Sequence, residues 1–217
     1  MMAAFSVCKR LMASNKISFI LTAVVVLCAT TSSDSPVALS NGNYTWLLAV
    51  LTPFFFVFYN LKKLLYLGTS KRDFYLGTLA SYGALSLLIS LVNTAIHLLI
   101  DPLHHTQRVI NLMEVCGWME NPVLVAFFQQ AAFLFLVMIF LHVLLFIQPH
   151  WYGWAMDVIL IAILCIFIPI APLRALLAGF FKLILLNAHA AFQISFCLTL
   201  SAALAAAGLA ALKQKAM

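Results

Sequence analysis

Residues 122–148 read PVLVAFFQQAAFLFLVMIFLHVLLFIQ, an apolar run that contains no charged side chain. A helix that crosses the hydrocarbon core of a bilayer needs about 20 predominantly apolar residues, and this run is longer than that. The whole chain has the same character, because 65% of its 217 residues are hydrophobic and only 8% are charged. Soluble domains carry about 25% charged residues. The sequence therefore predicts an integral membrane protein of the all-α class.

Five other apolar stretches predict five more transmembrane helices, which makes six in all. The pair Asp101-Pro102 ends the third span, because the residue before a proline disfavours helix. Six spans use about 120 residues. The chain is therefore expected to form a single transmembrane domain, residues 1–217, without a separate soluble catalytic domain. The expected spans are residues 17–31, 44–60, 78–100, 122–148, 155–172 and 192–212.

Lysine and arginine residues set the expected orientation, because cytoplasmic loops carry an excess of them. With the N-terminus inside the cell, only Arg108, Arg174 and Lys182 fall outside, and both termini are cytoplasmic. A secretory signal is the alternative for the first apolar run, but its cleavage-site pattern is poor, so we expect a retained span. The basic residues that fall inside are Lys9, Arg10, Lys16, Lys62, Lys63, Lys71, Arg72, Lys213 and Lys215.

Two segments between the spans differ from ordinary loops. Residues 61–77, LKKLLYLGTSKRDFYLG, mix leucine with lysine and predict a short amphipathic segment at the membrane surface. Residues 173–191 are too apolar for a loop, yet they contain Arg174, Gly179 and Lys182. We expect a re-entrant element there, because non-helical backbone at membrane depth survives only when it is packed in protein. One long helix is the alternative.

No enzymatic site is expected. The sequence contains no phosphate-binding GxxxxGK[ST] loop, no GxSxG and no HExxH. The five cysteines are scattered without a CxxC pair, so neither a disulfide nor a zinc site is predicted. The basic residues form no face with interleaved aromatic residues, which argues against nucleic acid. Asp157 lies near the start of the fifth span, where an interface position is the favoured interpretation.

Polar side chains within the spans have two interpretations. They either line a substrate path or cross-link neighbouring helices by hydrogen bonds, and the second is favoured. Intramembrane histidines could instead ligate haem in a membrane redox protein, although His97 and His142 lie at unmatched depths. The small residues 202–208 of the last span predict a close helix or subunit contact. The candidates for a path are Asn93, Gln129, Gln130 and Gln193, and those for haem or metal also include His189 and the pair His104-His105.

The stretch YLGTSKRDFYLGT, Tyr66–Thr78, resembles the cytoplasmic segment of ABC-2 type permeases, the membrane subunits of many ATP-driven exporters. Members commonly carry a Gly-x-Ser-Arg-x-x-Phe pattern there. The motif covers about a dozen residues, and the expected layout of six spans covers nearly the whole chain. At this length the chain looks like the compact permeases of bacterial peptide and bacteriocin exporters, without a large extracellular domain. The matching residues are Gly68, Ser70, Lys71, Arg72, Asp73 and Phe74.

The resemblance implies a permease subunit in the bacterial cytoplasmic membrane. It would form the path for an amphipathic peptide or lipid-like substrate, pair with a second permease copy or paralogue, and bind a separate ABC ATPase subunit that holds the ATP. The alternative for the basic segment is attraction to anionic lipid. A substrate-capturing subunit of an energy-coupling-factor importer is a further alternative. The implied ATPase-docking residues are Leu65, Tyr66, Gly68, Ser70, Lys71, Arg72, Asp73 and Phe74.

Overall fold

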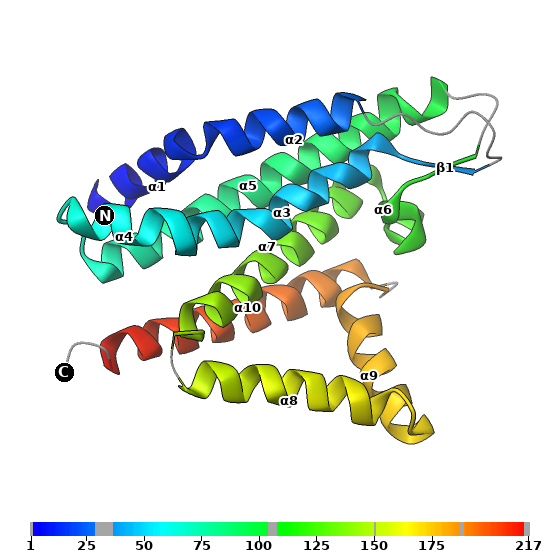
Figure 1. The fold of residues 1–217 in the computed structure, drawn as a ribbon. Helices are drawn as coiled ribbons and strands as arrows, with labels where there is room; N and C mark the ends of the chain where they lie inside the picture. The colour runs from blue at the N-terminus through cyan, green and yellow to red at the C-terminus, as the bar shows by residue number, and fades with distance from the viewer. Residues whose placement is uncertain (1, 29–36, 104–107, 150, 187–188, 215–217) are drawn as a thin grey trace.

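The computed structural model describes residues 2–28, 37–103, 108–149, 151–186 and 189–214. This part of the chain is mostly helical, and its long helices form an elongated bundle (Figure 1). The helices are α1 (Met2–Ser14), α2 (Lys16–Cys28), α3 (Thr45–Phe54), α4 (Leu61–Tyr66), α5 (Lys71–Leu99), α6 (Leu112–Val115), α7 (Val123–Ile147), α8 (Trp151–Phe167), α9 (Ala171–Ile184) and α10 (Ala190–Gln214).

The described residues include four helical stretches that are long and apolar enough to cross a membrane. A fifth is formed if the bent pair of α8 and α9 counts as one span. The expected all-α architecture is confirmed, and the apolar helices are compatible with a multi-pass membrane protein. The four stretches are Asn41–Tyr66, Lys71–Leu103, Val123–Ile147 and Ala190–Ala211.

Helix α7 lies at the centre of the bundle and packs against α3, α5 and α10. A helix that is apolar on every side is stable only when it is surrounded by protein or lipid. Its residues Leu134, Met138 and Ile139 are almost completely buried, together with Tyr82 of α5 and Phe56. The run of residues that decides the membrane class therefore also supplies the core.

The predicted second span is longer than expected. Helix α3 passes through Pro53 into a π-helical segment, Phe55–Asn60, which α4 extends to Tyr66. A separate surface helix over residues 61–77 is therefore not confirmed. The first part of this segment continues the second span, and its last part, from Lys71, begins α5.

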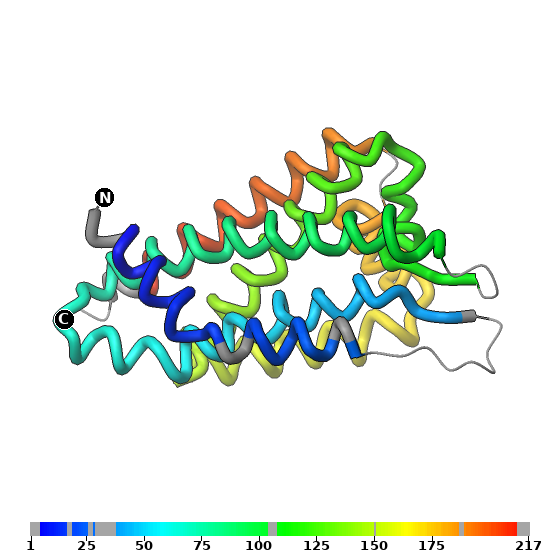
Figure 2. The backbone as a smooth tube through the Cα atoms, turned by 90° about the horizontal axis from the view of Figure 1, so that it is seen from above, coloured from blue at the N-terminus to red at the C-terminus, as the bar shows by residue number. Residues whose placement is uncertain are grey.

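Helices α1 and α2 occupy the region of the expected first span. Helix α2 has only 13 residues, fewer than the about 20 that a crossing needs, and residues 29–31 lie outside the described part. Val7 and Leu11 of α1 are buried in the main core. Figure 2 shows α1 beside the start of α5 and α2 running along α3. A sixth span is thus neither confirmed nor contradicted.

The direction of the chain bends by 119° between α8 and α9. Residues 173–184 belong to α9, a helix distinct from α10, so the alternative of one long helix from residue 173 is not observed. Pro172 at the start of α9 fits this break, because proline is tolerated in the first helical turn. The chain folds back sharply before its last helix.

One end of the bundle, which we call the α6 end, carries two short strands. β1 (Val37–Leu39) pairs in parallel with β2 (Arg108–Ile110). Trp118 is buried beside them, stacks on Trp46 and donates its indole N–H to the Leu185 carbonyl at 2.8 Å. The opposite end, the α4 end, holds the N-terminus, α4 and the end of α10 (Figure 1).

Candidate functional site

The turn between α4 and α5 is closed by a glycine. Gly68 has a φ of 82°, in the left-handed region that favours glycine. Its N–H donates to the Leu65 carbonyl at 3.0 Å, and the Thr69 N–H donates to the Leu64 carbonyl at 3.1 Å. Such bonds satisfy the last carbonyls of a helix. Gly68 thus ends α4 within a single turn.

A capping box begins α5 two residues later. The Ser70 hydroxyl oxygen accepts the Asp73 N–H at 3.0 Å and donates its own proton to the Asp73 carboxylate at 2.7 Å. The N-cap position favours serine, because its oxygen satisfies an otherwise unpaired N–H of the first turn. Gly68, Ser70 and Asp73, three residues of the ABC-2-like motif, therefore fix the shape of the turn.

The remaining motif residues divide by exposure. The Tyr66 side chain is 90% exposed and Leu67 is 61% exposed, at the tip of the turn. Lys71 and Arg72 are also exposed. Phe74, in contrast, is 1% exposed and belongs to the main core, so it is not available to a partner.

We call Tyr66–Arg72 the tip. Leu65, which precedes it, is half-buried. Sequence reasoning overlooked Leu67, because the motif match does not include it. The leucine and lysine residues of the run LKKLLYLG, residues 61–68, already indicated an amphipathic segment that contains Leu67.

The α4 end is basic. Exposed lysine and arginine side chains from α1, α2, α4 and α5 lie at this end, with Asp73 among them held by Ser70. A surface of one charge sign steers and orients a charged partner. The exposed basic residues described here are Lys9, Arg10, Lys16, Lys62, Lys63, Lys71 and Arg72. Lys215 lies outside the described residues.

Two of the four path candidates bond to each other. The Gln129 amide N–H donates to the Gln193 side-chain oxygen at 2.7 Å, and Asn121 donates to the Gln129 oxygen at 3.2 Å. Gln193 in turn donates to the Ile184 carbonyl at 2.8 Å. Both glutamines have no exposed surface. This geometry joins α7, α9 and α10 and supports the cross-linking interpretation.

The other two path candidates are also engaged. Gln130 accepts a hydrogen bond from Ser90 at 3.1 Å, and Asn93 contacts Asn111 at 3.1 Å. Both are fully buried. None of the four lines the cavities described below, so their role as a path stays a prediction.

The histidines do not form a haem site among the described residues. His142 is fully buried and bonds to the Tyr82 hydroxyl at 2.9 Å. His97 lies fifteen residues beyond Tyr82 along α5, or about 22 Å at 1.5 Å per residue, which is too far for two ligands of one iron. The described residues contain no group of three His, Cys, Asp or Glu side chains that could hold a metal. The pair His104-His105 lies outside the described part, and His189 is exposed.

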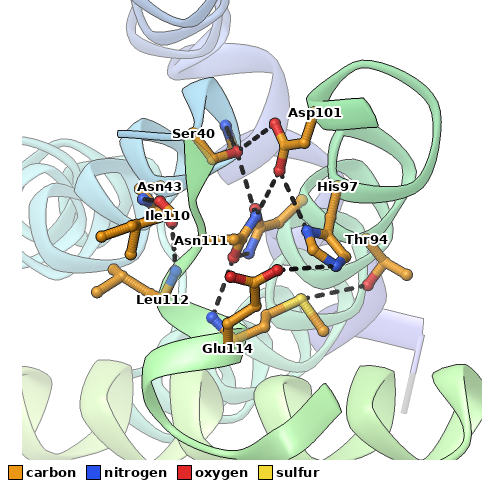
Figure 3. Close-up of polar contacts among 12 residues, drawn as sticks. Ser40, Asn43, Thr94, His97, Asp101, Ile110, Asn111, Leu112 and Glu114 are labelled. Carbon is orange, nitrogen blue, oxygen red and sulfur yellow. Dashed lines mark hydrogen bonds and ion pairs between the residues drawn. The ribbon is translucent and has the colours of Figure 1, made fainter. Parts of the chain in front are cut away.

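A buried polar cluster at the α6 end was not foreseen (Figure 3). Ser40 donates to Asp101 at 2.8 Å, and Asn111 donates to Ser40 at 3.2 Å. His97 bonds to the other oxygen of Asp101 at 3.1 Å, while its second nitrogen lies 3.9 Å from Glu114. The cluster ties the long connections at this end to α5.

An apolar cavity lies between α2, α3 and α5. It has a volume of about 640 Å³, within the range of small-molecule sites. Leu48, Leu88 and Val92 are among the residues that give it apolar walls, and Asn41 and Thr45 supply polar groups toward the α6 end. The cavity could take a largely apolar molecule with one polar end.

Comparisons with protein-family models, curated proteins and solved structures found no match for this chain. Any function proposed for the chain therefore depends on the geometry of the described residues. It presents a rigid, basic tip with two exposed apolar side chains, and it presents an apolar cavity within the bundle. Among the described residues, neither arrangement brings together an acid, a base and a nucleophile.

Proposed function

We propose that this chain is the permease subunit of an ATP-driven exporter of the ABC-2 type, and that its tip docks a separate ABC ATPase subunit. The proposal includes six transmembrane helices, both termini in the cytoplasm and a location in the bacterial cytoplasmic membrane. In this arrangement α2 belongs to the first span, residues 17–31, and α1 lies on its cytoplasmic side. The bent pair of α8 and α9 supplies the fifth span and a re-entrant element before α10.

The observation that carries this proposal is the exposure of Tyr66 and Leu67 on a rigid turn. Large apolar side chains at 90% and 61% exposure leave an unfavourable contact with water unless a partner covers them. The turn joins two helices long enough to cross a membrane, so a force on the tip reaches both helices directly. Lys71 and Arg72 at its rim would orient an acidic partner.

The distribution of charge supports the orientation. Seven of the ten exposed basic side chains among the described residues lie on α1, α2, α4 and the start of α5, whereas Arg108, Arg174 and Lys182 lie on β2 and α9. The positive-inside rule places the more basic end in the cytoplasm. An ATPase that uses cytoplasmic ATP must dock on that side. The α6 end, with its buried polar cluster, then faces the outside of the cell.

The apolar cavity between α2, α3 and α5 supports an amphipathic substrate. Its walls offer no charged group among the lining residues, which suits an apolar helix face or an acyl chain better than an ion. Polar groups at one end, Asn41 and Thr45, would receive the polar part of such a molecule. A second permease copy would complete the path across the membrane.

Co-purification tests the docking role. The chain is co-expressed with the ABC ATPase encoded beside its gene, and the amount of ATPase retained on the tagged permease is measured. We expect retention by wild type and its loss in the double variant Tyr66→Ala, Leu67→Ala, because truncation of a central aromatic anchor typically costs at least about 2 kcal/mol of binding.

Phe5→Ala is the matched control. Phe5 is 74% exposed on α1 and is not part of the tip. It should leave retention unchanged, and all three proteins should elute alike on size exclusion. Equal retention by the double variant and wild type would reject the tip as the docking surface. A substitution of Phe74 is unsuitable, because it would disturb the core.

A further inference from the structure

We propose that the cavity between α1 and α4 binds the phosphate group of an anionic phospholipid, held by Arg10 and Lys63. This inference does not depend on the proposed function. The cavity borders the tip, and Leu67 lines its rim, but neither cation belongs to the tip.

The cavity has the chemistry of an anion site. Its volume is about 370 Å³, and its polar lining comes from Arg10, Ser14, Asn60 and Lys63. Its lining includes two basic side chains and no carboxylate. Arginine offers a planar set of five N–H donors that matches phosphate, and lysine adds a second positive charge. A phosphate entering between them would be bound by two full positive charges.

The floor of the cavity is fixed before any ligand arrives. The Ser14 hydroxyl donates to the Asn60 side-chain oxygen at 2.9 Å, which links α1 to the end of the π-helical segment. The Asn60 amide donates to the Phe55 carbonyl at 3.2 Å, and Asn60 is only 1% exposed. Because these side chains are held by their own bonds, binding would order little beyond the two cations.

The neighbouring surface favours a lipid over free phosphate. The Lys63 ammonium lies 5.9 Å from the centre of the Tyr59 ring. Tyr59 and Phe58 are 64% and 62% exposed and lie one turn from Lys63, toward the middle of the bundle. Acyl chains attached to a phosphate in the cavity could therefore run along exposed aromatic rings. Basic pockets between membrane helices are known to hold anionic headgroups in this way.

Arg10 and Lys63 have one competing explanation. Lys63 lies in the last turn of α4, where a positive charge offsets the helix dipole, and Arg10 lies before the last turn of α1. A dipole role would stabilise the protein equally in every lipid, whereas a headgroup site would act only when anionic lipid is present. The two explanations therefore differ in their lipid dependence.

The test uses two double variants that remove the same charge from the same helices. Arg10→Gln, Lys63→Gln changes the cavity, and Lys9→Gln, Lys62→Gln changes neighbouring exposed positions outside its lining. Each full-length protein is placed in nanodiscs of phosphatidylcholine alone, or of equal parts phosphatidylcholine and phosphatidylglycerol. Native mass spectrometry then measures the lipid retained, and thermal unfolding measures stability.

We expect wild type and the Lys9, Lys62 control to retain phosphatidylglycerol selectively. The cavity variant should lose about 30-fold of this preference, given the typical contribution of two charges near a membrane surface. If both variants lost the preference for phosphatidylglycerol equally, general surface charge would explain it, and the proposed site would be rejected. If the cavity variant were destabilised equally in both kinds of nanodisc and retained lipid as wild type does, Arg10 and Lys63 would act only on the helix dipole, and the proposal would be rejected.

Two further arms separate the remaining outcomes. Inorganic phosphate, added to protein in detergent, should stabilise wild type far less than phosphatidylglycerol does. If phosphate alone stabilises it equally, the site takes a free anion and the lipid assignment fails. The charge-retaining swap Arg10→Lys, Lys63→Arg should keep most of the lipid preference. It provides a second test if the neutral variant does not fold, and loss of preference in the folded swap would contradict the proposal.

Discussion

Asn111 is a position at which a single added charge should strongly destabilise this fold. It is fully buried, and its amide nitrogen donates to Asn93 at 3.1 Å and to Ser40 at 3.2 Å (Figure 3). The same nitrogen lies 3.5 Å from a carboxylate oxygen of Asp101. The substitution Asn111→Asp would replace this donor with a second carboxylate of nearly the same shape.

The expected loss follows from the geometry. Two unit charges about 3.5 Å apart repel by about 5 kcal/mol at an effective dielectric constant of 20, and the lost hydrogen bonds add about 2 kcal/mol. Relaxation and sharing of a proton reduce the sum, so we expect Asn111→Asp to lower the free energy of unfolding by about 4 kcal/mol near neutral pH. Asn111→Ala removes the bonds without adding charge and should cost about 2 kcal/mol.

The dependence on pH distinguishes repulsion from simple loss of bonds. Repulsion raises the folded-state pKa of one carboxyl in the Asp101 pair above its unfolded value, so stability is gained as pH falls through that raised pKa. Tryptophan fluorescence during thermal unfolding in detergent would measure both variants against wild type at about pH 7 and about pH 5. Equal effects of Asp and Ala, or a deficit that does not shrink in acid, would refute the reasoning.

Three other predictions concern packing, cross-linking and thiol chemistry. Gly208→Ala places a Cβ 2.3 Å from the Tyr75 hydroxyl, so its unfolding midpoint should fall by the equivalent of about 1–3 kcal/mol. Gly179→Ala, which meets nothing within 4 Å, should not lower it. Gln129→Leu leaves the buried Gln193 side-chain oxygen without its donor and should cost about 1–3 kcal/mol, whereas replacing both glutamines with leucine should restore part of the loss in the same unfolding assay. Burial raises the pKa of the Cys116 thiol to about 11, so maleimide labelling of a variant that keeps only this cysteine should still rise about tenfold per pH unit between about pH 7 and about pH 9. A plateau in that interval would contradict the burial of this thiol.

Composition and hydropathy predicted the membrane class and the central helix. The expected span 122–148 corresponds closely to α7, Val123–Ile147, because a long uncharged run leaves the chain few alternatives. The end expected at Asp101-Pro102 also matches, since α5 ends at Leu99. Both features depend on local sequence alone, so hydropathy and the proline position are enough to predict them.

In the segment 61–77, local sequence did not indicate where one helix ends and the next begins. The mixture of leucine and lysine indicated a surface helix, but it equally fits the last turns of a span that emerges from a membrane. Gly68 and the pair Ser70 and Asp73 carried the missing signal, because a glycine followed by a capping box ends one helix and begins the next. Phe74 was assigned to a docking surface without regard to the face of α5 on which it lies.

The cluster at the α6 end could not have been predicted. Ser40 and Asp101 are 61 residues apart, and Ser40 and Asn111 are 71 apart. No periodicity links such positions, so the pairing depends on how the helices pack. The same holds for Gln129 and Gln193, which are polar residues of α7 and α10 whose partners become visible only in the folded bundle.

The affinity of the purified ATPase subunit for the nanodisc-embedded chain tests the central claim most directly. Dissociation constants would be measured for wild type, for Tyr66→Ala with Leu67→Ala, and for the Phe5→Ala control. The account predicts binding by wild type and control, and at least about 30-fold weaker binding by the tip variant. Equal dissociation constants for all three proteins, or no binding by wild type, would contradict it.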